Sequence, residues 1–161
     1  MTWRERLLGT NERYKQASLN PGEAVQGTWV GARSAWGGLP FTGGQIALSN
    51  DRVIFNPINT DGAQKILAAG ARVAGVPAVG LGLRALRQTG ALDPTSVPRG
   101  GVTSVQPGRD AGILHPPTVV IDSDSGRQEL GIVHNAAAPN WSKRNVEARD
   151  AFLRALQGRS G

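Results

Sequence analysis

The sequence predicts one mainly β domain of antiparallel strands, interrupted by a helical segment and closed by a C-terminal helix. Two strand-like runs flank the turn residues Ser49-Asn50-Asp51, further strand-like runs follow residue 96, and a helical stripe ends the chain. At 161 residues the chain has the length of a single domain. Its 39% of hydrophobic residues and its 22 glycines predict a modest core and many loops.

The first third of the chain predicts a short helix, a strand and a loop. Residues 3–16 place Trp3, Leu7 and Leu8 among mixed charges, which favours a helix with one packed face. Asn20-Pro21-Gly22 ends this helix, and residues 23–33 are the first expected strand. Residues 31–44 are so rich in glycine that we expect an irregular loop there.

Residues 45–57 carry the clearest pattern. Ile46 and Leu48 alternate with other residues before the turn, and Arg52-Val-Ile-Phe-Asn-Pro57 is a β-branched and aromatic run after it. Pro57 cannot donate to a ladder, so it should end the second strand. We therefore expect an antiparallel hairpin.

Residues 58–96 change to small and aliphatic residues at helical spacing, which predicts two short helices broken near Pro77. Residues 66–86 are long enough to cross a bilayer, but they include Arg72 and Arg84. An arginine near the centre of a membrane helix costs about 2.5–3.5 kcal/mol. We expect no membrane-spanning helix here.

The last third predicts three strands and a helix. The strands are expected at residues 97–106, 117–122 and 127–134, with a turn at 122–126. The helix is expected at 141–156, with Asn140 as N-cap and Gly158 at the C-cap. Its core stripe would be Trp141, Ala148, Phe152 and Ala155. The predicted organisation is an N-terminal helix or arm at 1–18, one domain at 19–157 that contains the 58–96 insertion, and a tail at 158–161.

The motifs of these segments resemble the bacterial pleckstrin-homology-like and GRAM families. Residues 44–57 follow the family's hairpin pattern, and Leu19-Asn-Pro-Gly-Glu23 is similar to its opening motif. Residues 97–105 resemble a later strand, and residues 118–133 followed by Trp141 resemble the last hairpin and its tryptophan-led helix. The resemblance implies a bent antiparallel barrel capped at one end by the C-terminal helix and used for lipid or protein recognition. The 58–96 insertion, between predicted strands 3 and 4, departs from that pattern.

The composition excludes several classes of site. The chain has no cysteine, hence no disulfide and no thiolate metal site. Neither histidine has a carboxylate or a second histidine at ligand spacing, and residues 122–126 lack the closing glutamate of a calcium loop. No nucleophile motif or carboxylate pair is present. We therefore predict no enzymatic activity, no metal and no cofactor.

The candidate binding residues lie in two segments. Arg33 stands alone where phosphoinositide recognition needs several cations, whereas Trp36, Leu39 and Phe41 could form an apolar wedge or fold back on the barrel. The insertion is cationic, and its basic residues are Lys65, Arg72, Arg84 and Arg87. In one interpretation this segment contacts an anionic membrane. In the other, the basic residues are solvated and the aliphatic residues of the insertion pack on the barrel or on another subunit.

The formal net charge of +6 favours anionic partners. We expect a non-enzymatic binding module for a protein partner, for copies of itself in a homo-oligomer, or for an anionic membrane surface; the alternative is a basic nucleic-acid-associated protein. The N-terminus reaches no apolar run of signal-peptide length. A cytoplasmic location is predicted, with peripheral attachment at the inner face of the membrane as the open alternative.

Overall fold

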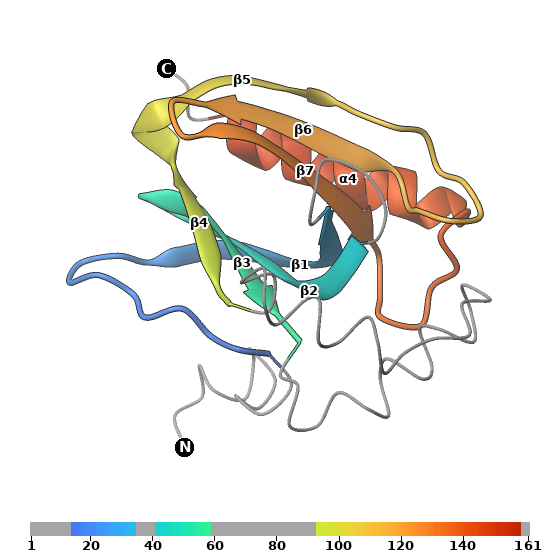
Figure 1. Ribbon diagram of the computed structural model, residues 1–161, viewed down its shortest axis with the longest axis horizontal. Helices are drawn as coiled ribbons and strands as arrows, with labels where there is room; N and C mark the ends of the chain where they lie inside the picture. The colour runs from blue at the N-terminus through green and yellow to red at the C-terminus, as the bar shows by residue number, and fades with distance from the viewer. Residues whose placement is uncertain (1–13, 35–40, 59–92, 159–161) are drawn as a thin grey trace.

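The computed structural model describes residues 14–34, 41–58 and 93–158. Within these residues the chain forms seven strands, one 3-10 turn and one helix (Figure 1). The elements are β1 (Val25–Ser34), β2 (Phe41–Ser49), β3 (Arg52–Pro57), β4 (Thr95–Pro98), η1 (Arg99–Gly101), β5 (Val102–Pro107), β6 (Thr118–Ser123), β7 (Gly126–Val133) and α4 (Lys143–Gln157).

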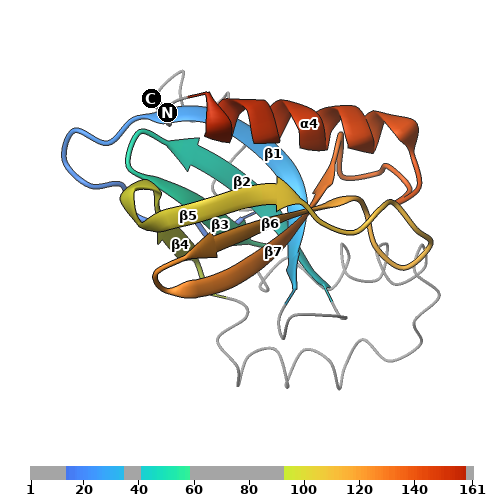
Figure 2. The same cartoon turned by 90° about the horizontal axis from the view of Figure 1, so that it is seen from above.

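The strands form one antiparallel sheet in the order β4-β3-β2-β1-β7-β6-β5. β1 joins the two halves, because it pairs with β2 along its whole length and with β7 only from Val30 to Arg33. The sheet bends at this junction, and α4 lies across it against β5, β6 and β7 (Figure 2). The prediction of a mainly β fold with one C-terminal helix is confirmed. Among the described residues, no helix is long and apolar enough to cross a membrane.

The predicted hairpin at residues 45–57 is confirmed. β2 and β3 are antiparallel, with Ile46 opposite Phe55 and Leu48 opposite Val53. The Ser49 hydroxyl accepts the backbone N–H groups of Asp51 and Arg52 at 3.1 and 3.0 Å, which is the turn chemistry that the sequence indicated. β3 ends at Pro57, as expected.

The prediction that residues 31–44 form an irregular loop is wrong at both ends. β1 continues to Ser34 and β2 begins at Phe41, with Gly31 paired to Gly44. A Cβ at Gly31 would overlap the carbonyl oxygen of Gly131 and the Ile46 side chain. Gly31, Gly43 and Gly44 are therefore strand residues, and the lack of a side chain lets neighbouring strands approach closely.

Residues 97–106 do not form the single strand that we predicted. β4 and β5 lie at opposite edges of the sheet, separated by η1. The Arg99 side chain fixes this break, since its Nη1 donates to the Ser49 carbonyl at 3.1 Å while its backbone N–H donates to the Asp51 carbonyl at 2.8 Å. Thr95 and Ser96, which we assigned to the insertion, belong to β4. The two helices predicted between them and Pro57 fall on residues 59–92, outside the described residues.

The described part of the predicted N-terminal helix is extended instead. Tyr14 forms a β-bridge with Ile58, and the Lys15 N–H donates to the Pro57 carbonyl at 2.7 Å. The Ala17 N–H donates to Asn56 Oδ1 at 2.9 Å, so this segment runs along β3. These contacts with a strand edge replace helical hydrogen bonds. Residues 3–13 lie outside the described residues.

The C-terminal helix is confirmed, with a different start. Ser142 is the N-cap in place of Asn140, and Gly158 occupies the C-cap, where its N–H donates to the Arg154 carbonyl at 2.8 Å. Three residues of the predicted core stripe are confirmed: Phe152 is fully buried, and Ala148 and Ala155 pack against the core. Trp141 is the exception, because it precedes the helix and is 56% exposed.

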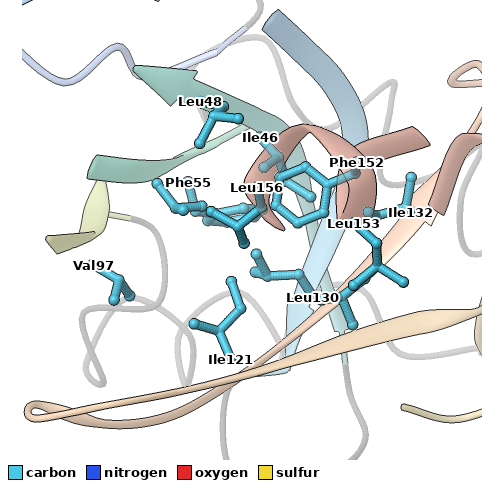
Figure 3. Packing of buried hydrophobic residues seen from close by; sticks show 12 residues of the cluster. Ile46, Leu48, Phe55, Val97, Ile121, Leu130, Ile132, Phe152, Leu153 and Leu156 are labelled. Carbon is cyan, nitrogen blue, oxygen red and sulfur yellow. The ribbon is translucent and has the colours of Figure 1, made fainter. Parts of the chain in front are cut away.

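The core lies between α4 and the inner face of the bent sheet (Figure 3). The Phe152 ring meets Trp29 of β1 edge to face, with ring centroids 5.0 Å apart. The helix therefore packs against β1 next to the stretch where β1 pairs with β7. The buried cluster consists of Ile46, Leu48, Val53, Phe55, Val97, Val119, Ile121, Leu130, Ile132, Phe152, Leu153 and Leu156.

Candidate functional site

Two connections emerge side by side at one end of the molecule. Residues 108–117 join β5 to β6, and residues 134–142 join β7 to α4. Both lie next to the start of α4 in Figure 1 and in Figure 2. They carry three of the four large hydrophobic residues that are exposed among the described residues: Ile113, Leu114 and Trp141. We call these three residues the turn-tip patch.

The first connection is a tight turn on a fixed base. The Gly112 N–H donates to the His115 carbonyl at 2.9 Å, so Ile113 and Leu114 occupy the tip, where they are 73% and 56% exposed. At the base, the Thr118 hydroxyl accepts the Arg109 N–H at 2.6 Å. Because the base is hydrogen-bonded to β6, the sheet holds the two apolar side chains in solvent.

The second connection is also a turn, clamped from below by Asn145. The Ser142 N–H donates to the Pro139 carbonyl at 3.1 Å, which places Asn140 and Trp141 at the corner. Asn145 is fully buried, and its amide nitrogen donates to the Pro139 and Asn140 carbonyls at 2.8 and 3.1 Å. Its Oδ1 accepts the backbone N–H of His134 at 3.0 Å and lies 2.9 Å from His134 Nδ1. One buried amide thus ties the end of β7, the turn and the helix together.

A side-chain hydrogen bond links the two turns. Asn140 Nδ2 donates to the Ile113 carbonyl at 3.1 Å, so the tip of one turn is fastened to the corner of the other. Two hydrogen-bonded turns with such a link form a surface of fixed shape. The three residues of the turn-tip patch are therefore presented by rigid backbone.

Positive charge adjoins the patch. Lys143 and Arg144 begin α4, both are exposed, and the first turn of the helix contains no acid. The positive end of a helix dipole disfavours cations there by several tenths of a kcal/mol each. This placement costs stability, and an anionic partner at the patch would offset the cost.

The opposite end of the sheet carries a buried ion pair. The Glu23 carboxylate is fully buried; it accepts Arg52 Nε at 2.9 Å, the Ser49 hydroxyl at 2.6 Å and the Asn20 N–H at 2.8 Å. These bonds, led by that from Arg52, lower the pKa of Glu23 from 4.5 to about 2. All of these partners are internal, so the network fastens residues 18–24 to the β2–β3 turn and offers no acid for catalysis.

Glu23→Gln is expected to lower the free energy of unfolding at pH 7 by about 2 kcal/mol, since hydrogen bonds to buried charges contribute roughly 1.5–3 kcal/mol. Because folding lowers the pKa of Glu23, its contribution is complete above the unfolded pKa and is lost as the pH falls from about 5 to about 2. Urea unfolding at several pH values measures this difference. The gap between wild type and variant should shrink across that window, while the exposed control Glu147→Gln changes little. A gap that stays constant down to pH 2 would contradict this role.

Most residues that we predicted as binding residues lie outside the described part of the chain. These are Trp36, Leu39, Lys65, Arg72, Arg84 and Arg87. Phe41 begins β2. Arg33 is half-buried in β1, with its guanidinium carbon 5.6 Å from the centroid of the Phe55 ring, and burial lowers the pKa of the guanidinium. The Arg33 side chain thus packs over the ring of Phe55, a residue of the core.

The patch contains residues that sequence reasoning missed. We assigned Trp141 to the core stripe of the helix, and we did not single out Ile113 or Leu114. The sequence did contain a signal for exposure. Ile113 and Leu114 are two adjacent apolar residues between predicted strands, with Gly112 before them and His115-Pro116-Pro117 after them. Apolar residues in a turn segment have no strand face to occupy, and this favours exposure.

The acidic turn between β6 and β7 is a hairpin turn, as predicted. Asp122 bonds Arg127 and Ser104, and these bonds lower the pKa of Asp122. Among the described residues, no group of three or more histidine, aspartate or glutamate side chains is placed to hold a metal ion.

Comparison with known proteins identifies no family. No family model matches the sequence, and no curated protein matches it either. Among solved structures, the chain is similar to the C-terminal domain of an unknown protein from Leishmania infantum, with a TM-score of 0.48 and 8% identity. The similarity covers 86% of this chain and 84% of the other. It assigns neither a family nor an activity to this chain.

Proposed function

We propose that this protein is a non-enzymatic binding module with a pleckstrin-homology-like fold, and that it contacts its partner through the turn-tip patch. Support for the fold comes from the strand order, in which β4 to β1 and β7 to β5 form two consecutive antiparallel runs joined by the β1–β7 pairing. A single helix follows the last strand and covers the bend. This arrangement supports the bent, helix-capped barrel that the sequence resemblance implies.

The observation that carries the binding role is the exposure of the patch on rigid backbone. Scattered exposed apolar residues are normal on a protein surface. Here a tryptophan, an isoleucine and a leucine, each more than half exposed, stand on two turns joined by the Asn140–Ile113 hydrogen bond. Grouped apolar exposure of this kind is typical of interaction sites. The hydrogen bonds maintain the exposure, because they prevent the turns from folding the side chains back onto the sheet.

The described polar groups support binding over catalysis. The most perturbed carboxylate, Glu23, bonds internal partners at all its contacts, and His134 bonds the buried Asn145. A catalytic pair would instead direct a nucleophile and a base toward the same open space. The loop around Trp36 and the cationic insertion remain predicted contributors to binding.

The charge distribution argues against the nucleic-acid alternative. Five of the described basic side chains form ion pairs with acids, which reduces the net positive charge that they could offer to a phosphate backbone. The basic residues that begin α4 are only two, and they adjoin apolar turns. Lys15, Arg52, Arg109, Arg127 and Arg149 are the paired residues.

Fractionation of cells that express the chain tests the proposed role. We expect wild type to fractionate with membranes or with a heavier complex, and the triple variant Ile113→Ser, Leu114→Ser, Trp141→Ser to remain with free monomeric protein. Leu19→Ser is the matched control, since Leu19 is 48% exposed on a segment at the opposite end of the molecule in Figures 1 and 2. Circular dichroism checks that each variant is folded. Identical distributions for wild type and the triple variant would reject the patch as the binding surface.

A further inference from the structure

We infer that the surface met by the turn-tip patch is an anionic lipid bilayer, into whose interface Ile113, Leu114 and Trp141 insert while Lys143 and Arg144 meet the headgroups. This inference rests on the proposed binding role of the patch and names its partner. Three observations carry it: the residue types at the tips, the state of the turn backbone, and the charge beside them.

The tip residues suit the depth of a membrane interface. Ile113 and Leu114 are aliphatic and stand at the end of the narrow turn closed by Gly112 and His115. Trp141 stands on the neighbouring turn, and tryptophan favours the level of the headgroups, where its ring is half apolar and half hydrated. A convex apolar tip needs a matching pocket on a protein partner, whereas a fluid bilayer accepts it without a preformed shape.

The backbone hydrogen bonds of the two turns favour entry into a medium with little water. An unpaired N–H or carbonyl opposes entry into an apolar environment. Here the Gly112 N–H bonds the His115 carbonyl, the Ile113 carbonyl accepts the Asn140 side chain, and the Ser142 N–H bonds the Pro139 carbonyl. The bonds that close the two turns and link them are therefore made within the protein before any lipid is met.

The charge beside the tips selects an anionic surface. Lys143 and Arg144 directly follow the Trp141 turn, and neither forms an ion pair with another residue of the described ranges. Their place at the positive end of α4 is unfavourable in isolation, and lipid phosphates would complement both the cations and the helix dipole. Asp110 and Glu147 are the nearest acids in sequence; they precede the first tip by three residues and follow Lys143 by one helical turn.

Sedimentation of the purified chain with vesicles tests the inference. We expect binding to vesicles of equal parts phosphatidylcholine and phosphatidylglycerol, and little binding to phosphatidylcholine alone. Lys143→Gln with Arg144→Gln should weaken partitioning roughly 25-fold, because each cation near an anionic surface changes it about fivefold. Ile113→Ser, Leu114→Ser and Trp141→Ser together should weaken it by more than about tenfold, through loss of apolar insertion.

Matched controls are available on the same molecule. Arg154→Gln removes an exposed cation from the last turn of α4, and Leu19→Ser removes an exposed apolar residue far from the patch. Both should bind vesicles as wild type does. Trp36→Ala separates the patch from the loop that the sequence singled out, and binding lost in that variant but kept in the triple variant would overturn the inference.

The remaining outcomes separate the inference from the proposed function. Absence of binding to either vesicle overturns the lipid assignment. If fractionation still places wild type, and not the triple variant, in a heavy protein complex, the patch is a protein-binding surface and the module role stands. If the triple variant also fractionates as wild type does, both proposals fail.

Discussion

Phe152→Ala is expected to lower the free energy of unfolding by about 4 kcal/mol, because removing a buried phenylalanine side chain costs roughly 3–5 kcal/mol. Phe152 is fully buried, and its ring packs edge to face on Trp29 with an interplanar angle of 74°. The substitution removes the aromatic contact and leaves a cavity beneath α4, at the place where β1 separates from β7. Urea unfolding followed by circular dichroism measures the change.

The matched control for this substitution is Arg154→Ala, which shortens an exposed side chain of the same helix. Substitutions at such surface positions usually change stability by about 0.5 kcal/mol or less. If Phe152→Ala cost no more than Arg154→Ala, α4 would not be part of the core. The helix would then be a peripheral element, and the closure of the sheet would need another explanation.

Asn145→Ala should cost about 3 kcal/mol, although the side chain that it shortens is small. The substitution leaves the His134 N–H and the Pro139 and Asn140 carbonyls without their partner, and each unsatisfied buried group costs roughly 1–3 kcal/mol. Water that reaches the turn can bond some of these groups, so we expect the loss of stability to lie at the lower end of the range that the three groups give together. Because the turn that carries Trp141 loses its clamp, vesicle binding should weaken together with stability.

Asn135→Ala is the control for Asn145→Ala. Asn135 is an exposed asparagine of the same connection, and its side-chain Oδ1 accepts one local bond, from the Ala137 N–H at 2.9 Å. Its loss should cost under about 1 kcal/mol and leave vesicle binding unchanged. Equal effects of the two substitutions would show that the connection is stabilised locally and that Asn145 does not organise it.

Local sequence was sufficient wherever an element depends on local chemistry. The β2–β3 hairpin follows from the alternation of Ile46 and Leu48 and from the turn residues after them, and the register of the pair agrees. The helix follows from the spacing of Phe152 and its neighbours, and Gly158 occupies the predicted C-cap position.

Local sequence failed where tertiary contacts override propensity. Gly31 and Gly44 suggested a loop, but the two residues pair within the sheet because only a residue without Cβ fits where the strands crowd. Residues 97–106 were assigned to one strand although Pro98, Gly100 and Gly101 disfavour a continuous strand. Nothing local shows that Arg99 bonds the β2–β3 turn and that β4 and β5 lie at opposite edges of the sheet.

The sequence predicted which residue types would form the candidate site, but not where the site lies. Apolar residues beside cations were expected at a binding surface, but we placed that surface on Trp36 and on the 58–96 insertion. The link between the two turns depends on Asn140 and Ile113, which are 27 residues apart in sequence, and no local pattern indicates that they meet. Trp141 fitted a helical stripe by spacing alone, and the Pro139–Ser142 turn removes it from the helix.

Amide relaxation by spin-labelled lipid, recorded by NMR on the chain bound to anionic bicelles, tests the turn-tip patch as the membrane contact most directly. The structure predicts the strongest broadening at residues 111–116 and 138–144, and little effect at the β2–β3 turn at the other end of the sheet. Broadening that is strongest at the β2–β3 turn or along β5, with residues 111–116 and 138–144 unaffected, would contradict the account.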